Sequence, residues 1–534
     1  MKKTIKYISH ALAFALLICF SSCTGDFEKI NTNPFGVTDE DLYQDNNSIG
    51  QHFTALQQSI YFNFDGGSGT DWTYQLFQNL NADIWSGYLA TPSNFEGGVN
   101  NQTYSLISGW NDYCWNETYN HIMSNSLRVK EKCLEQGFET YYHFDAINTV
   151  LRVLAMSRIC DQYGAVIYSR YGEELTGGVY DSGPDAYKLF FKELDEAVKA
   201  LEKTIGNEAA SFSKFDMAYD GDFTKWMKLA NTIRLRLAIR IVKYDAALAR
   251  EQAEAAVNAP QGLILTDGDI FRLSGQGYRN PLYTLSMDWS DIFINANVVS
   301  ILGGYQDARL SKFGIPKSDN KVMGVRSGIP GLDKNADEYK RVISNVNIAS
   351  TSTPVILCTA AESYFLLAEA ALRGWNVGGD AETFYEQGIK ASFEQWGVNV
   401  GDYLESSLKP GDWIDPLVDE FNMAAASQVT PKWEDAKTNE ERLEKIVTQK
   451  WIAMFPEGMN AWAEWRRTGY PKLFPIGRNE SQGVIPTELG VRRLPFTVSE
   501  KSNNPEGYAE AVRLLGGTDN GATRVFWDIN KPNI

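Results

Sequence analysis

Histidine is scarce in this 534-residue chain, which contains only four. Three of them, His52, His121 and His143, lie outside the N-terminal segment and form no metal-ligating pattern, which argues against a histidine-rich metal site. Basic residues are outnumbered as well: 50 Lys and Arg stand against 67 Asp and Glu, for a net charge of −17. Nucleic acids and anionic membrane surfaces bind to basic patches, so we expect neither as an electrostatic partner.

The motifs of the common catalytic folds are absent too. There is no GxSxG elbow, no HExxH helix, no GxxxxGK[ST] loop and no GxGxxG turn after a strand, and the GGSGT stretch at 66–70 precedes no suitable helix. Asp267-Gly268-Asp269 has only part of an EF-hand loop, so a weak structural calcium site is the one cofactor left open. We therefore expect a binding protein that is not an enzyme and has no cofactor. A glycosidase needs only two converging carboxylates, which one sequence cannot reveal, so it remains an alternative.

A long hydrophobic run is missing at the N-terminus. The apolar stretch Ala11–Phe20 is shorter than the about 20 residues that a membrane-spanning helix needs. It follows three lysines and precedes small residues, which predicts a signal peptide over residues 1–22.

The end of this signal peptide resembles the lipobox of bacterial lipoproteins. Ser21-Ser22-Cys23 places two small residues before a cysteine, although Phe20 stands where Leu is usual. We expect Cys23 to be lipidated, with ordinary cleavage near Ser22 as the alternative. Residues 23–48 are polar and rich in Asn, Asp, Thr and Gly, as expected of a tether.

The remaining cysteines follow no metal or redox spacing. No CxxC pattern occurs among them, so we expect small buried side chains without a disulfide or metal role. These residues are Cys114, Cys133, Cys160 and Cys358.

Amphipathic helices dominate residues 49–534, which we expect to form a single, mainly α domain. Ser182 before Pro184, Asp222, and Thr359 with Glu362 three residues later are typical helix starts. Apolar side chains recur after each start with helical spacing. The helical scaffold is predicted mainly over 143–260 and 355–470, with helices at 143–161, 246–258, 381–396 and 441–455 besides the three capped ones.

Long irregular stretches separate the helices, at 62–72, 91–111, 262–350, 398–440 and 470–534. Loops of this length inside a compact protein usually carry function. The chain has 14 Trp and 26 Tyr, and many of them lie in these stretches beside Gly, Asn and Asp. Sugar rings stack their C–H faces on aromatic planes, while polar side chains bind the hydroxyls. We therefore predict ligand-binding insertions mainly over 62–115, 262–350 and 398–440.

Six segments in order resemble the SusD/RagB family of outer-membrane lipoproteins. DFEKINTNP follows Cys23, and RICDQYGAVIYS resembles the family's D-x-Y-G-x-[IV]-P-Y segment, with Ile167 in place of Pro. FTKWMKLANTIRLRLAIRI at 223–241 and AAESYFLLAEAALRG resemble two family helices. The strongest likeness is EKIVTQKWIAMFPEGMNAWAEWRRTGYPKL at 444–473, and IPTELGVRRLPFTVSEKSNNPEGY resembles the C-terminal loop.

This resemblance implies a scaffold of tetratricopeptide-like repeats with an irregular ligand-binding half. It implies a lipoprotein on the outer membrane, facing the cell exterior, that acts as a lid on a SusC-like TonB-dependent transporter. Its ligand would be an oligosaccharide or polysaccharide; peptide capture, as in RagB-like members, and a purely structural lid are the alternatives. Arg466 and Arg467 lie inside a scaffold motif, where structural hydrogen bonding is expected.

The family's ligand residues lie in variable loops, so no motif transfers them. Segments 85–110 and 278–295 fall where family ligand loops usually lie. We predict Trp85, Tyr88, Trp110, Tyr278, Tyr283 and Trp289 as stacking residues, and Asn94 and Asn101 as hydrogen-bonding residues.

Overall fold

The computed structural model describes residues 44–61, 71–173, 177–207, 209–275 and 277–534. The signal peptide, Cys23, most of the tether and the GGSGT stretch lie outside these ranges. The described chain is mainly helical, as predicted, and Ile49–Ile534 form one compact unit. None of the described helices has both the length and the apolar character needed to cross a membrane.

The helices fall into a long set and a short set. The long ones are α4 Asn47–Ile60, α6 Ser108–Glu117, α7 Ser124–Gln136, α8 Phe138–Tyr163, α9 Gly183–Glu202, α10 Phe223–Arg240, α11 Ala246–Val257, α13 Ala296–Gly304, α16 Ala360–Leu372, α17 Ala381–Gln395, α18 Asn439–Met454, α19 Gly458–Thr468 and α21 Pro505–Leu515. The short ones are α5 Asp71–Tyr74, α12 Pro281–Tyr283, α14 Leu310–Phe313, α15 Ala336–Val342 and α20 Val498–Asn503.

The predicted caps start their helices. The Ser182 hydroxyl accepts a hydrogen bond from a backbone N–H in the first turn of α9, and Asp222 does the same for α10. Thr359 Oγ1 accepts from Glu362 N at 3.0 Å at the start of α16. Gly374, just past the end of α16, has a positive φ of 76°, which a glycine adopts without steric cost. Local chemistry therefore sets where these scaffold helices begin and end.

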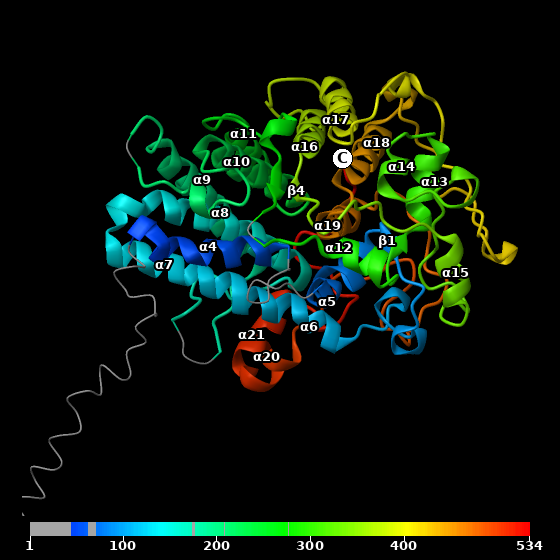
Figure 1. Cartoon of the computed structure of the whole chain (residues 1–534), viewed down its shortest axis with the longest axis horizontal. Coiled ribbons are helices and arrows are strands. Elements are labelled where there is room, and N and C mark those ends of the chain that lie inside the picture. The colour runs from blue at the N-terminus through cyan, green and yellow to red at the C-terminus, as the bar shows by residue number, and fades with distance from the viewer. Residues whose placement is uncertain (1–43, 62–70, 174–176, 208, 276) are drawn as a thin grey trace, which may run out of the picture. The chain divides into compact units, whose positions relative to one another are not determined.

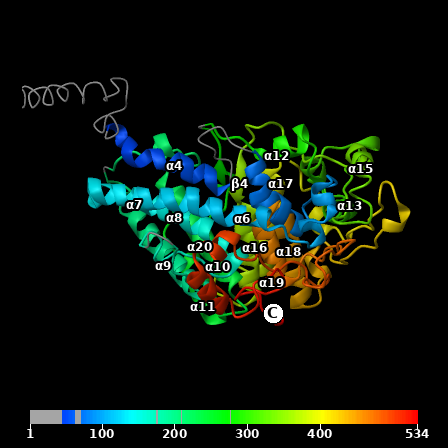
Figure 2. The ribbon, with the colours of Figure 1, turned by 90° about the horizontal axis from the view of Figure 1, so that it is seen from below.

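The long helices pack as consecutive antiparallel pairs, as in tetratricopeptide repeats. α8 packs on α9, α10 on α11 and α16 on α17, and α10 and α16 join neighbouring pairs (Figures 1 and 2). α18 continues the stack against α16 and α17. The irregular segments with α13, α14 and α15 lie on the other side of α18 and α19 (Figure 1).

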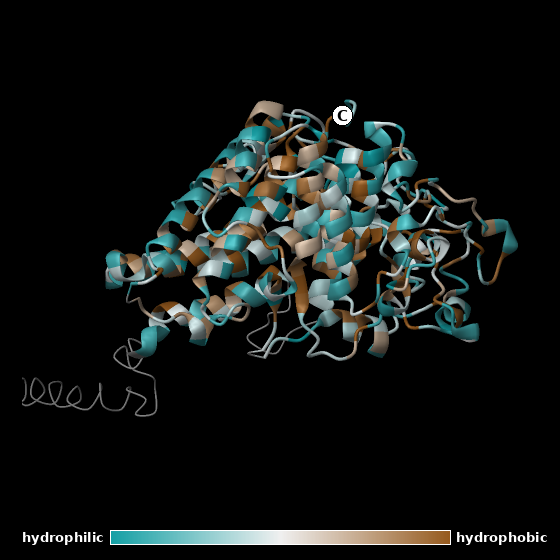
Figure 3. Ribbon diagram, turned by 90° about the horizontal axis from the view of Figure 1, so that it is seen from above, coloured by the Kyte–Doolittle hydropathy of each residue, from teal (hydrophilic) through white to brown (hydrophobic). Residues whose placement is uncertain are grey.

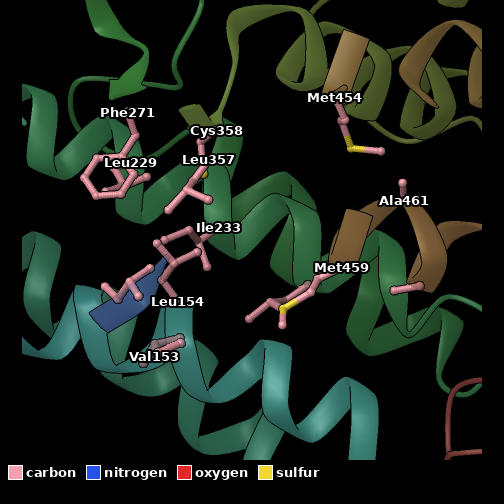
Figure 4. Packing of buried hydrophobic residues seen from close by; sticks show 14 of the residues in the cluster. Val153, Leu154, Leu229, Ile233, Phe271, Leu357, Cys358, Met454, Met459 and Ala461 are labelled. Carbon is pink, nitrogen blue, oxygen red and sulfur yellow. The ribbon is translucent and has the colours of Figure 1, made fainter. Parts of the chain in front are cut away.

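The core lies between the paired helices. Hydrophobic and hydrophilic residues alternate along the long helices (Figure 3), and most of the hydrophobic ones are buried. Leu154 of α8 and Ile233 of α10 meet there, and Leu357 approaches from the strand that precedes α16 (Figure 4). Cys114, Cys133, Cys160 and Cys358 are buried, as predicted, and carry free thiols.

Two small antiparallel sheets connect the irregular segments. β1 Leu89–Ala90 pairs with β3 Phe293–Ile294, so two loops about 200 residues apart in the sequence lie side by side. β2 Phe271–Leu273 pairs with β4 Val355–Cys358, which brackets the insertion between them. Long-range pairing therefore holds the loops in place.

Buried ion pairs join the scaffold helices. Arg467 binds both carboxylate oxygens of Glu369, each at 2.7 Å, and one oxygen of Glu464 at 2.6 Å. Arg240 and Lys450 also bind Glu464, at 3.0 Å and 2.6 Å. Burial raises the pKa of Glu369, but the charges of Arg467 and Arg373 more than offset this and hold that pKa at about 2.

The two arginines of the WRRTG segment have structural roles, as predicted. Arg466 Nη1 donates to the carbonyls of Asp161 and Arg492, both at 2.7 Å, and its guanidinium lies 3.7 Å from the centre of the Trp462 ring. Arg467 belongs to the ion-pair network. Neither is available to a ligand.

The prediction of an irregular C-terminal segment over 470–534 is wrong for α20 and α21. Thr497 Oγ1 caps α20 by accepting from Glu500 N at 3.2 Å. Asn504 Oδ1 accepts from Gly507 N at 3.1 Å and precedes Pro505 in the first turn of α21. Both starts carry ordinary cap signals. The helices that follow are short, so only a few apolar residues mark them in the sequence.

Asp83 is a buried carboxyl whose charge is poorly compensated. It accepts hydrogen bonds from Tyr74, Gln78 and Asn79 at 2.9, 2.9 and 3.2 Å. Burial raises its pKa to about 7, although these three donors oppose the rise.

Asp83→Asn should therefore change the pH dependence of stability. Because its pKa in the folded state is raised, Asp83 contributes stability that is complete below the unfolded pKa and is lost as pH rises toward about 7. Asn does not titrate, so the unfolding free energy of the variant relative to wild type should rise by roughly 2–3 kcal/mol between pH 5 and pH 8. Urea unfolding at both pH values measures this. A difference that is constant with pH would contradict the raised pKa.

Candidate functional site

Two tryptophans project from the loop half into solvent. Trp72, on α5, is 43% exposed, and Trp289 is 41% exposed. α5 packs against α12 and against the π-helix Thr284–Asp288 that ends at Trp289, so the two indoles belong to neighbouring segments. Figure 1 shows α5 beside α12.

The segment before Trp289 is fixed by its local sequence. Asn280 caps α12 by accepting from Leu282 N at 3.1 Å, and Pro281 occupies the first turn. The helix then widens, and Trp289 N donates to Thr284 O at 2.9 Å. Such π-turns are rare in proteins as a whole, and those that occur often lie at functional sites. A hydrogen-bonded turn therefore presents the exposed indole.

α6 supplies further rings beside these segments. Tyr113 meets Trp72 edge-to-face, with ring centres 5.4 Å apart. Three residues earlier on the same helix, Trp110 meets Phe95 edge-to-face at 6.0 Å. Burial raises the pKa of the Tyr113 hydroxyl, and the nearby Glu117 charge adds to this, so the phenol stays a neutral hydrogen-bond donor.

Asp291 joins the loop around residue 93 to these helices. Its carboxylate accepts from Ser93 Oγ at 2.9 Å and from Gln75 Nε2 at 3.2 Å. Asn94 follows Ser93, is exposed and makes no capping hydrogen bond to the 3-10 helix that it precedes. Its amide therefore remains available to a ligand.

Together these contacts connect four segments into one candidate site. We call it the aromatic surface, and its rings are Trp72, Phe95, Trp110, Tyr113, Tyr283 and Trp289. Flat rings of this kind stack on apolar faces of sugars, and Asn94 and the Tyr113 hydroxyl can bind hydroxyl groups. This arrangement can bind a ligand without reacting with it.

Four of the predicted site residues lie on this surface. Asn94 and Trp289 are exposed, and Trp110 and Tyr283 are half-buried. They come from the two segments, 85–110 and 278–295, that the sequence indicated.

The other four predicted residues are buried. Trp85 donates its indole N–H to Asn101 O at 3.0 Å, and Asn101 itself bonds to Leu80 O and Asn111. Tyr88 is wholly buried, and its hydroxyl donates to Trp451 O. Tyr278 is only 6% exposed. Asn101, Tyr88 and Tyr278 thus belong to the core and offer no face to a ligand in this structure.

Trp72, Tyr113 and Phe95 were not among the predicted site residues. Trp72 follows the glycine-rich stretch at 66–70, which is a signal for an exposed aromatic. Tyr113 lies one helical turn after Trp110, so the spacing of the two rings could have placed them on one face. Nothing local distinguishes Phe95.

Asp267 and Asp269, the candidate calcium ligands, have cationic partners. Asp267 pairs with Arg272 at 2.5 Å and Asp269 with Lys228 at 2.9 Å. Across the described residues, no three His, Cys, Asp or Glu side chains cluster so as to hold a metal ion.

Two hollows lie apart from the aromatic surface. A groove of about 910 Å³ between the 299–323 and 412–416 segments has mostly apolar walls, and Ile414 on its edge is 57% exposed. A smaller, more enclosed pocket of about 160 Å³ has Trp85 and Arg326 among its walls.

The chain is similar to solved structures over most of its length. A chitin-binding SusD homologue from Flavobacterium johnsoniae is 43% identical, with a TM-score of 0.86 over 91% of this chain and 100% of that one. A SusD homologue from Bacteroides vulgatus is 39% identical, with a TM-score of 0.87 over 93% and 100%. One from Bacteroides uniformis is 35% identical, with a TM-score of 0.82 over 90% and 99%. No curated protein matches the sequence.

The family match agrees with the fold. The model of the SusD-like family, described as Susd and RagB outer membrane lipoprotein, matches residues 29–528. That range includes the paired-helix scaffold and all four segments of the aromatic surface. The chain therefore belongs to the SusD-like family of outer membrane lipoproteins.

Proposed function

We propose that this protein captures a glycan outside the cell on its aromatic surface and does not cleave it. The observation that carries the proposal is the pair of exposed indoles, Trp72 and Trp289, on packed neighbouring segments. Exposed tryptophans lose favourable burial, so a ligand that covers them gains binding free energy. The chitin-binding homologue, at 43% identity, supports a glycan as the ligand class.

The anchor and the partner complete the proposal. Cys23 carries the lipid, residues 23–48 form the tether, and the domain from residue 49 faces the exterior as a lid on a SusC-like TonB-dependent transporter. A tether raises the local concentration of the lid over the transporter, so modest glycan affinity suffices. Family membership supports this arrangement.

A binding array with product analysis tests capture without cleavage. The mature protein is exposed to immobilised polysaccharides and peptides, and bound glycans are recovered and sized. We expect retention of an intact glycan. Shortened products would show a glycosidase, and binding of peptides alone would show RagB-like capture.

Cys23→Ala should abolish lipidation. Without the thiol the lipid has no attachment site, so metabolic labelling with a clickable fatty acid should be lost and the protein should leave the membrane fraction. Ser22→Ala, which keeps a small residue before the cysteine, should retain the label. Labelled Cys23→Ala protein would refute the anchor.

A further inference from the structure

The enclosed pocket beside Trp85 has the features of a second ligand site. Its volume is about 160 Å³, and Tyr104, Trp465 and Arg326 line it together with Trp85. A cavity of about 150 Å³ accommodates a benzene ring, so this pocket has room for the carboxylate-bearing edge of a larger sugar ring. No ring of the aromatic surface lines it.

Arg326 brings an incompletely compensated positive charge to this pocket. It is only 7% exposed, and its guanidinium donates to two neutral carbonyls, Phe421 O at 3.2 Å and Pro475 O at 3.0 Å. Nε has no acceptor among the described residues. A guanidinium has five N–H donors, and these two bonds use only two of them.

Asp415 is the carboxylate whose charge acts on Arg326, and only one of its two oxygens is engaged elsewhere, since Oδ2 has no hydrogen-bond partner among the described residues. Its Oδ1 accepts from the Tyr339 hydroxyl and from the backbone N–H of Leu417 and Val418, each at 3.0 Å. No ion pair within 4.0 Å joins it to Arg326 in the described chain. Burial lowers the pKa of Arg326, and Asp415 only partly opposes this.

Other buried arginines of this protein have the kind of partner that Arg326 lacks. Arg309 binds Asp307 at 2.6 Å and Arg236 binds Glu362 at 2.6 Å. Arg466 lacks a carboxylate, but its guanidinium lies against tryptophan rings, which stabilise a cation. Arg326 has neither a paired carboxylate nor a stacked aromatic ring among the residues that the structure describes. Burying an unpaired charge is costly, so an anion in the pocket would be stabilising.

We propose that this pocket binds a uronic acid unit, with the sugar carboxylate on Arg326. A carboxylate matches the planar guanidinium, and the sugar ring would contact Trp85 and Trp465. The Tyr104 hydroxyl, which has no acceptor among the described residues, would bind a sugar hydroxyl. The choice of a sugar acid rests on the proposed glycan function, whereas the need for an anion rests on Arg326 itself.

Glu488 gives the proposal a sharp test because it is exposed and lines the same pocket. Its negative charge opposes an anionic ligand and leaves a neutral sugar unaffected. Glu488→Gln should therefore strengthen binding of the anion alone. An exposed side chain can be changed in this way with little effect on folding.

The full mature protein, purified in detergent, is titrated with D-glucuronate, D-glucose, acetate and chloride. Calorimetry measures the affinity for each of these probes. We expect glucuronate to bind at least tenfold more tightly than glucose, acetate or chloride. Arg326→Met should remove this preference, and Glu488→Gln should tighten glucuronate binding several-fold without changing glucose binding.

Equal affinities for glucuronate and glucose would overturn the proposal, as would acetate or chloride binding as tightly as glucuronate. If Arg326→Met does not fold, as judged by circular dichroism, Glu488→Gln decides: tighter binding of glucuronate with unchanged binding of glucose supports the proposal, and an equal change for both sugars overturns it. Trp289→Ala alters the aromatic surface and not the pocket, so it distinguishes binding at the two sites. If polysaccharide binding fails while glucuronate binding is selective, only the aromatic surface is refuted. If the polysaccharide binds but glucuronate binding is not selective, only the pocket is refuted.

Discussion

Arg467→Met should destabilise the protein by about 3–5 kcal/mol, because it leaves two buried carboxylates without their shared partner. Arg467, Glu369 and Glu464 are almost completely shielded from water, and three hydrogen bonds of 2.6–2.7 Å join them. Methionine has a similar length and fills the space, so the loss comes from charge rather than from a cavity. Urea unfolding at pH 7 measures it.

The chain offers a matched control for this change. Arg513 pairs with Glu510 on the surface, where both side chains are well exposed. Exposed pairs contribute between about 0 and 1 kcal/mol, so Arg513→Met should be nearly neutral. Equal effects at the two positions would contradict the role assigned to the buried network.

The buried pair should also make stability depend on acid pH. Arg467 and its neighbours hold the pKa of Glu369 at about 2, below its ordinary value of 4.5. A lowered carboxyl pKa contributes stability above the unfolded pKa and loses it as pH falls from 4.5 toward 2. The cost of Arg467→Met should therefore shrink over that window.

Gly458→Ala should be the second severe change, with a loss of about 3 kcal/mol or more from overpacking. A Cβ at this first residue of α19 would lie 2.2 Å from Asp83 Oδ1 and 2.6 Å from Asp83 Cα. The second contact is with backbone, which cannot rotate away. The expected result is a lower urea midpoint, or failure to fold at 37 °C.

Gly109→Ala is the control for that substitution. Gly109 lies in the first turn of α6, and a Cβ there meets nothing within 4 Å. Alanine in a helix is favoured over glycine by about 0.5–1 kcal/mol, so this variant should be neutral or slightly more stable. If Gly458→Ala were tolerated equally well, the close packing of α19 against Asp83 would be contradicted.

The scaffold could be predicted from the sequence because its signals are local. Ser182, Asp222 and Thr359 each cap a helix within three residues of themselves, and apolar spacing marks the buried faces. The WRRTG segment was likewise interpreted correctly, because scaffold motifs predict packing.

The candidate site could be predicted only in part, because exposure depends on distant partners. Trp85 and Trp289 have similar sequence surroundings. Trp85 is buried because Asn101 accepts its indole N–H and Trp462 packs against its ring at 4.9 Å. Tyr88 is buried because Trp451, far along the chain, accepts its hydroxyl. Trp289 has no such partner within the described chain and stays at the surface.

The most direct test of capture by the aromatic surface is calorimetry with the best array hit. Wild type is compared with the Trp72→Ala/Trp289→Ala double variant, and Tyr244→Ala serves as an exposed aromatic control on the scaffold. Each ring should contribute on the order of 1 kcal/mol, so the double variant should bind roughly thirtyfold more weakly, with the glycan intact in every case. Tyr244→Ala should bind like wild type. Unchanged affinity in the double variant, or a shortened glycan, would contradict capture of an intact glycan on this surface.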